Sequence, residues 1–287
     1  ASSSAASDVY KRQALHDQED PQVAQAIQEH YQPLQAGSEL PQTSAGKVVA
    51  ICDRVDTLIG IFATGKKPTG VKDPYALRRA AIALVRLSIE GECDFDLLTM
   101  LQYSAHLLQD RLATDTAAAE VFDYVMERLR GYYSDQNIGH DIFAAVRAVK
   151  PTRLIDFNDR MQAVCSFQSL SEAASLAAAN KRISNILKKT NAQESLAVDE
   201  SLFSVSAEKQ LHQQISQLEV EVAPLFASRQ YSDALTALAQ LRPSIDQFFE
   251  DVMVMDDNPL IRNNRIALLN KVSQAFKTAA DISLIQN

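Results

Sequence analysis

Residues 65–87 read GKKPTGVKDPYALRRAAIALVRL, and they predict an irregular loop that runs directly into a helix. The first half contains three residues that interrupt regular structure, Pro68, Gly70 and Pro74. In the second half, Asp73 is the expected N-cap and Pro74 the expected first helical residue. Apolar side chains then recur at helical spacing, at Leu77, Ala81 and Leu84. A loop followed by an amphipathic helix is therefore the first structural expectation.

The same stretch concentrates positive charge in an acidic protein. The 287 residues include 28 Lys and Arg against 36 Asp and Glu, which gives a formal net charge of −8. Between residues 65 and 87 the only acid is Asp73, and the basic side chains are Lys66, Lys67, Lys72, Arg78, Arg79 and Arg86. Arg79 and Arg86 are expected to project from one helical face. Contact with a polyanion must come from local patches of this kind, because the protein as a whole is acidic.

The composition predicts an all-α fold. Hydrophobic residues make up 46% of the chain, aromatic residues only 7%, and there are 8 Gly and no Trp. Abundant Ala, Leu, Gln and Glu favour helix over sheet. Apolar residues at alternating steps of four and three indicate core-facing helices, for example at Val48, Cys52, Val55, Ile59 and Phe62.

A cytoplasmic protein without a membrane partner is expected. No apolar run approaches the roughly 20 residues that a membrane-spanning helix needs. The three cysteines, Cys52, Cys93 and Cys165, lack the spacing of a metal site. They are expected to be reduced and mostly buried thiols.

The chain is expected to form two helical domains after a tail. Residues 1–13 are small, polar and aperiodic, which predicts a disordered or non-native tail. Residues 14–150 would form the first helical domain and residues 151–287 the second, with a bridge that begins at Pro151.

A second basic surface is predicted in the second domain. Ser169 and Glu172 have the spacing of a capping box, so a helix is expected to begin there. Its basic and amide side chains are Asn180, Lys181, Arg182, Asn185, Lys188 and Lys189, with no acid between them. Asn180 lies on the apolar stripe and must be hydrogen-bonded inside the bundle or face a functional surface. For Lys188 and Lys189, complementing the helix dipole is a competing explanation.

The last helix contributes two further basic residues. Asn258 and Pro259 are its expected N-cap and first residue. Arg262 and Arg265 follow one turn apart as candidate phosphate contacts, and salt bridges to Asp256 and Asp257 are the competing interpretation. The preceding aromatic and methionine stripe is expected to be core, at Phe248, Phe249, Val252, Met253 and Met255.

No catalytic residue is predicted in this chain. The sequence lacks a glycine-rich phosphate cradle, a Walker lysine, a Cys/His metal pattern and a nucleophile elbow. The remaining signals are basic surfaces on helices and loops. Such surfaces are typical of proteins that recognise a structured polyanion through phosphate and sugar contacts.

One long motif resembles a known family. Residues 50–87, AICDRVDTLIGIFATGKKPTGVKDPYALRRAAIALVRL, resemble the beta subunits of bacterial heterotetrameric glycyl-tRNA synthetases, which share the pattern P-x-G-x-K-D-P-x-A-L-R-R-A-A. The similarity continues through KPTRLIDFNDRMQAV, AAANKRISNIL, FFEDVMVMDDNPLIRNNRIALL and DISLIQ. It covers nearly everything from about residue 14 onward, and it corresponds to the C-terminal part of that longer subunit.

The resemblance implies both a fold and a role. It implies the end of an HD-like helical domain, followed by the helical anticodon-binding domain that arginyl-tRNA synthetases also use. The partners would be tRNA(Gly) and the synthetase alpha subunit in an alpha2beta2 assembly, with no DNA. The alpha subunit would hold the catalytic site, so this chain would bind no cofactor, although the holoenzyme uses ATP and Mg.

The resemblance also implies which partner each set of candidate residues would contact. The anticodon-domain set would bind tRNA through Asn180, Lys181, Arg182, Asn185, Lys188, Lys189, Arg262 and Arg265. The set in the first domain would touch tRNA elsewhere or the rest of the synthetase, through Lys66, Lys67, Lys72, Arg78, Arg79 and Arg86.

Two alternatives belong to other functional classes. An HD-type metal-dependent phosphohydrolase would use Asp53 and His16. The resemblance places Asp53 at the last acidic position of an HD metal set whose earlier motif would lie upstream, so an inactive HD relative without metal is the expectation. The other alternative is a non-enzymatic helical adaptor whose basic patches bind RNA or the acidic side chains of a protein.

Overall fold

The computed structural model describes residues 3–35, 37–69, 72–113, 115–190 and 197–286, and over these ranges its regular structure is helical. The only β-type pairings among the described residues are two isolated bridges, Thr69 with Lys72 and Asp96 with Arg153. The all-α prediction is therefore confirmed. Gly70 and residues 191–196, which belong to predicted loops, lie outside the described residues.

The chain forms two compact units. The first contains Ala1–Asn137 and Thr152–Ile155, and the second contains Ile138–Pro151 and Asp156–Asn287. Each unit takes a short segment from the other side of residue 150. The domain boundary predicted between residues 150 and 151 stays a prediction.

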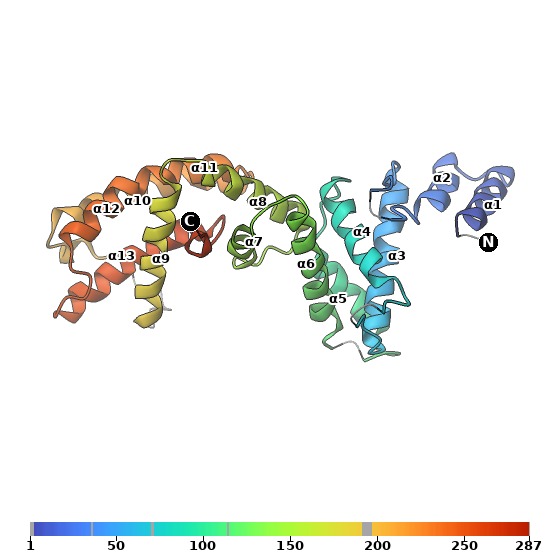
Figure 1. The fold of residues 1–287 in the computed structure, drawn as a ribbon, viewed down its shortest axis with the longest axis horizontal. Coiled ribbons are helices and arrows are strands. Elements are labelled where there is room, and N and C mark those ends of the chain that lie inside the picture. The colour runs from blue at the N-terminus through green and yellow to red at the C-terminus, as the bar shows by residue number, and fades with distance from the viewer. Residues whose placement is uncertain (1–2, 36, 70–71, 114, 191–196, 287) are drawn as a thin grey trace. The chain divides into compact units, whose positions relative to one another are not determined.

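Over its described residues, the first unit contains six complete helices. They are α1 (Ser3–His16), α2 (Pro21–Glu29), α3 (Ser44–Ala63), α4 (Leu77–Ile89), α5 (Leu97–Leu108) and α6 (Ala117–Ser134). Figure 1 shows α3, α4 and α6 side by side, and α5 packs against α3 and α6. Their contacts bury large aliphatic side chains completely, including Leu58, Ile59, Leu84, Leu87, Leu97, Leu101 and Leu129.

The structure folds most of the predicted tail as α1. Lys11 Nζ donates hydrogen bonds to Gln25 Oε1 at 2.7 Å and to Gln28 Oε1 at 2.6 Å, which joins α1 to α2. Because these contacts are polar, the sequence of α1 shows no apolar periodicity from which the helix could be predicted. This explains why residues 1–13 look irregular in the sequence.

The helix predicted to begin at Pro74 begins three residues later. Ala76 has a left-handed φ of 56°, so α4 begins at Leu77 rather than at Pro74. Asp73 still caps α4, because its carboxylate accepts the backbone N–H groups of Leu77 and Arg78, both at 2.9 Å.

The capping box predicted at Ser169 does not form. The Ser169 hydroxyl donates to the carbonyl of Ser166 at 2.6 Å. The next helix begins at Ala173, and Glu172, at its N-cap position, makes no side-chain capping bond. The Ser169 hydroxyl therefore bonds to the last turn of the preceding helix and does not cap the start of the next helix.

The cysteine prediction is also wrong in part. Cys52 is exposed, and Cys93 and Cys165 are partly exposed. On α3, Val55, Ile59 and Phe62 of the predicted stripe are buried, while Val48 and Cys52 face solvent. The predicted stripe is therefore correct in the second half of α3 and wrong in the first half, where Ala50 and Ile51 are buried instead.

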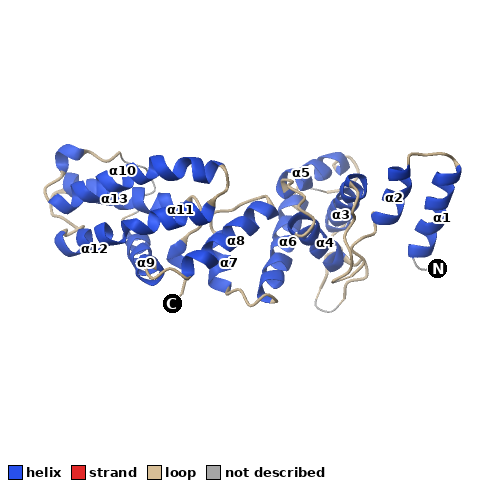
Figure 2. Ribbon diagram, turned by 90° about the horizontal axis from the view of Figure 1, so that it is seen from above, coloured by secondary structure: helices blue, strands red, loops and turns tan. Residues whose placement is uncertain are grey.

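The second unit is a bundle around α10. Its elements are α7 (His140–Arg147), α8 (Leu154–Gln168), α9 (Ala173–Lys189), η1 (Glu200–Leu202), α10 (Ser206–Ala227), α11 (Tyr231–Leu238), η2 (Ala239–Leu241), α12 (Arg242–Asp251), α13 (Pro259–Lys277) and η3 (Ile282–Leu284). Helix α10 contacts α11, α12 and α13, and α9 contacts α12, α13 and η3 (Figure 2). Helix α8 begins in the first unit and continues into the second.

A polar cluster joins α8, α11 and the end of α13. Arg160 Nε donates to Asp156 Oδ2 at 2.9 Å, and its Nη1 donates to the carbonyls of Thr278 and Ala279. The Tyr231 hydroxyl donates to Asp156 Oδ1 at 2.6 Å, and the Arg160 guanidinium lies 4.3 Å from the centre of the Tyr231 ring. Three segments far apart in sequence are thereby held together.

The Tyr231 hydroxyl predicts a pH effect on stability. Burial, and then its hydrogen bond to Asp156, raise the pKa of Tyr231 to about 12 from an ordinary value of 10.0. A raised folded-state pKa contributes stability below the unfolded pKa, and this contribution is lost as pH rises through the folded pKa. Urea unfolding between about pH 10 and about pH 12 should therefore show a steeper loss for the wild-type protein than for Tyr231→Phe. Parallel losses in the two proteins would contradict this assignment.

Within the described ranges, none of the helices is both long and apolar enough to cross a membrane.

Candidate nucleic-acid interface

The second half of α9 carries an exposed basic surface. Asn180 apart, every residue predicted for this surface is exposed: Lys181, Arg182, Asn185, Lys188 and Lys189. We call these five the basic face of α9. They occupy consecutive turns of one helix, and no acid lies between residues 173 and 189. A rigid helix thus presents four positive charges and one amide to solvent.

Asn180 belongs to the interior instead. It is only 3% exposed, and its Nδ2 donates to the carbonyl of Leu176 at 3.0 Å. Of the two predicted situations, a hydrogen-bonded amide inside the bundle is the one observed. Asn180 therefore supports α9 and does not add to the exposed surface.

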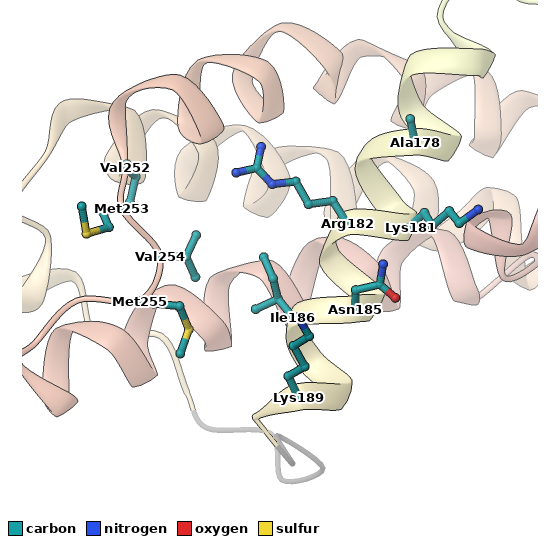
Figure 3. A pocket seen from close by; sticks show the side chains of 10 residues that line it. All are labelled: Ala178, Lys181, Arg182, Asn185, Ile186, Lys189, Val252, Met253, Val254 and Met255. Atoms are coloured by element: carbon teal, nitrogen blue, oxygen red, sulfur yellow. The ribbon is translucent and has the colours of Figure 1, made fainter.

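The basic face of α9 borders a groove of about 620 Å³. The opposite wall is the segment 252–255, which follows α12 and which we call the methionine segment. The lining residues are Ala178, Lys181, Arg182, Asn185, Ile186, Lys189, Val252, Met253, Val254 and Met255 (Figure 3).

The methionine segment corrects the prediction that Met253 and Met255 are core. Their exposed fractions are 76% and 54%, whereas Val252 and Val254 are buried. Helix α12 ends at Asp251, and Val252 has extended backbone angles. In extended chain, successive side chains point to opposite sides, so the valines enter the core and the methionines face solvent.

Arg182 spans the groove toward α12. Figure 3 shows its side chain extending from α9 in the direction of the methionine segment. Its guanidinium lies 3.9 Å from the centre of the Phe249 ring. Stacking on an aromatic face restrains a guanidinium while its N–H donors remain directed outward in its plane.

Arg265 lies beneath the groove in a buried network. It is 4% exposed, and its Nε donates to Glu208 Oε1 at 2.8 Å. Its Nη1 donates to the carbonyl of Met253 and to Asp256 Oδ2, both at 2.8 Å, and its Nη2 donates to Ser204 Oγ at 2.9 Å. The salt bridge to Asp256, offered above as the competing interpretation, is thus present. Arg265 holds the methionine segment in place from the inside.

The start of α13 agrees with prediction. The Asn258 side chain accepts the N–H of Leu260 at 3.0 Å, and Pro259 is the first helical residue. The backbone N–H of Asn258, and then Arg265, lower the pKa of Asp256. Arg262 is partly exposed, and its Nη1 donates to the carbonyl of Asp256 at 3.1 Å.

In the basic stretch of the first unit, some side chains are exposed and others pair with acidic side chains. Lys66, Lys72 and Arg79 are exposed, and Lys66 Nζ lies 5.7 Å from the centre of the Tyr75 ring. Lys67 is exposed but pairs with Glu120 Oε2 at 2.5 Å, and this contact lowers the pKa of Glu120.

Arg78 and Arg86 are more enclosed. Arg78 is partly exposed at the start of α4. The Arg86 side chain is 11% exposed and donates to both carboxylate oxygens of Glu90. Arg79 and Arg86 thus differ in exposure, and the pair with Glu90 accounts for Arg86 without an external ligand.

The described residues contain no group of three or more His, Cys, Asp or Glu side chains arranged to hold a metal ion. Asp53 is exposed on α3, and exposed His16 lies 3.2 Å from Asp17 Oδ1. The phosphohydrolase alternative therefore has no assembled ligand group in this part of the chain.

Two parts of the chain match known protein families. Residues 10–148 match the family described as glycyl-tRNA synthetase beta subunit, and residues 176–286 match the DALR anticodon binding domain. The glycine–tRNA ligase beta subunit of Shewanella putrefaciens is 45% identical over 270 residues, covering 94% of this chain and 39% of that protein. The corresponding subunit of Aeromonas salmonicida is 46% identical over 273 residues, covering 95% of this chain and 40% of that protein. The chain thus spans about two fifths of the length of these relatives.

Proposed function

The chain belongs to the glycyl-tRNA synthetase beta subunit family, and from this we propose that the basic face of α9 binds the anticodon arm of a glycine tRNA. The observation that carries the proposal is the acid-free row of exposed Lys, Arg and Asn side chains on one helix. It lies within the part of the chain that matches an anticodon binding domain. Cationic side chains fixed on a helix suit phosphate contacts, and an amide can read a base edge.

We further propose that the protein acts as one subunit of a glycine–tRNA ligase. A separate alpha subunit would supply the catalytic site and use ATP and Mg, while this chain would capture tRNA and bind no cofactor. The exposed Lys66, Lys72 and Arg79 would contact another part of the tRNA or the alpha subunit. Such an assembly would act in the cytoplasm.

Within the second unit, we propose different roles for exposed and buried basic residues. Lys181, Arg182, Asn185, Lys188 and Lys189 would touch the tRNA directly, and the partly exposed Arg262 would add a further contact. Asn180 and Arg265 would act by supporting the groove, because both side chains are buried and hydrogen-bonded within the protein.

The test is filter binding of glycine tRNA at several salt concentrations. The double variant Lys181→Ala/Lys188→Ala should bind about ten-fold more weakly, and the slope of log K against log salt should become shallower by about 1 to 2. Lys209→Ala, which removes an exposed lysine of α10 outside the groove, should leave both quantities unchanged. A glycine tRNA with an altered anticodon should bind the wild-type protein more weakly.

The anticodon role fails if both tRNAs bind equally well and the double variant loses no affinity. A salt slope near zero for the wild-type protein would instead favour an adaptor that binds another protein.

A further inference from the structure

Two neighbouring side chains of the first unit have buried polar atoms without partners. Tyr124 and Arg128 lie one turn apart on α6, and the Arg128 guanidinium lies 5.1 Å from the centre of the Tyr124 ring. The Tyr124 hydroxyl oxygen and Arg128 Nε are buried, and over the described ranges neither has a hydrogen-bond partner. Buried polar atoms are almost always paired, so two orphaned atoms on adjacent turns indicate a missing ligand.

Positive charge around the Tyr124 hydroxyl exceeds negative charge. Burial raises the pKa of Tyr124, and the charges of Arg128 and Arg78 oppose this rise while the charge of Asp73 adds to it. The Asp73 carboxylate already accepts two backbone N–H groups at the start of α4, each at 2.9 Å. The one nearby acid is thus committed to its helix, and an anion from outside would balance the second arginine.

The side chains are held in place but can be reached from solvent. The Tyr124 ring packs against Phe62, with 5.3 Å between the ring centres, and the Arg128 guanidinium lies over the same tyrosine ring. Tyr124 and Arg128 are both partly exposed as residues. The Arg128 side chain can change rotamer, which opens its buried Nε edge to an entering ion.

We propose that Arg128 and Tyr124 bind a small free oxyanion of the phosphate class. A guanidinium presents parallel N–H donors that match two oxygens of a phosphate, and the Tyr124 hydroxyl can donate to another oxygen. Arg78, at the start of α4, adds attractive charge without having to touch the ion. The site lies in the first unit and is separate from the basic face of α9.

The depth of these donors favours a small ion over RNA. Lys66, Lys72 and Arg79 are exposed, as side chains that contact an RNA backbone must be. Arg128 Nε and the Tyr124 hydroxyl lie below the surface, where a free ion fits and a phosphate within a nucleotide chain is kept out by its neighbours. A carboxylate has two oxygens and matches the guanidinium alone, whereas a phosphate has oxygens for both donors.

Calorimetric titration of the full chain with inorganic phosphate tests the site, with chloride of equal ionic strength as the blank. The wild-type protein should bind phosphate saturably. Arg128→Gln should bind about ten-fold more weakly and Tyr124→Phe roughly three-fold more weakly, because each loses donors to a charged ligand. Arg130→Gln is the matched control on the same helix. Arg130 is 49% exposed and pairs with Glu127 at 2.7 Å, so its variant should bind like wild type.

Urea unfolding shows whether Arg128 has a partner inside the protein. In phosphate-free buffer, Arg128→Gln should unfold at the wild-type urea midpoint or above it, because the described residues offer no acceptor to its Nε. Added phosphate should raise the midpoint of the wild-type protein more than that of Arg128→Gln. The variant should keep only the general stabilisation that phosphate gives as an excluded salt.

Three results overturn the proposal. The first is equal phosphate affinity of the wild-type protein and Arg128→Gln. The second is a lower urea midpoint of Arg128→Gln in phosphate-free buffer, which shows that the guanidinium is satisfied within the protein. The third is weaker binding of glycine tRNA by Arg128→Gln while free phosphate fails to bind, which assigns Arg128 to RNA. All three leave the basic face of α9 untouched, so the proposed function is tested separately.

Discussion

Replacing Arg265 with alanine is expected to lower the free energy of unfolding by about 3–5 kcal/mol, because it leaves a buried carboxylate without its counter-charge. The side chains of Arg265 and Glu208 are 4% and 1% exposed, and they are joined at 2.8 Å. Glu208 Oε2 also accepts the backbone N–H groups of Ser204 and Val205, which fixes the carboxylate inside. Urea denaturation of the full chain, followed by circular dichroism, measures the loss.

Arg262→Ala provides the matched control for Arg265. It lies one turn earlier on α13, is partly exposed, and makes one hydrogen bond to the Asp256 carbonyl at 3.1 Å. Its removal should cost about 1 kcal/mol or less. If the two variants lose equal stability, the buried network does not hold this part of the fold.

Helix positions followed from apolar periodicity, whereas some helix ends depended on local backbone geometry. The cap at Asn258 was predicted correctly, because Asn followed by Pro leaves few other conformations at a helix start. At Asp73 the same chemistry was present, but the left-handed Ala76 delayed the helix by three residues. A single backbone dihedral of this kind leaves no mark in residue composition.

The basic face of α9 could be predicted because charge is local in sequence. Its lysines lie within ten residues, and an acid-free stretch is visible without a structure. The role of Arg265 could not be predicted, because its partner Glu208 lies 57 residues away along the chain. The prediction that the methionines are core is wrong because the sequence does not reveal that α12 stops at Asp251, after which the side-chain period changes from helical to extended.

Replacing Arg160 with alanine is expected to cost about 2–4 kcal/mol, because one largely enclosed side chain satisfies several acceptors at once. Its donors reach Asp156 Oδ2, the carbonyls of Thr278 and Ala279, and the Tyr231 hydroxyl, at distances from 2.6 to 2.9 Å. The Arg160 and Asp156 side chains are 15% and 14% exposed, so water replaces few of these bonds. Urea unfolding of the full chain gives the loss.

Two further variants separate this cluster from an ordinary surface ion pair. Arg242→Ala removes an arginine that is 40% exposed and pairs with Asp246 at 3.5 Å, and it should cost between about 0 and 1 kcal/mol. Tyr231→Phe should cost about 1 kcal/mol, and its effect should shrink in the Arg160→Ala background because the two residues share Asp156. Additive losses for Arg160 and Tyr231 would show that they stabilise the fold independently, and the cluster would then not act as a unit.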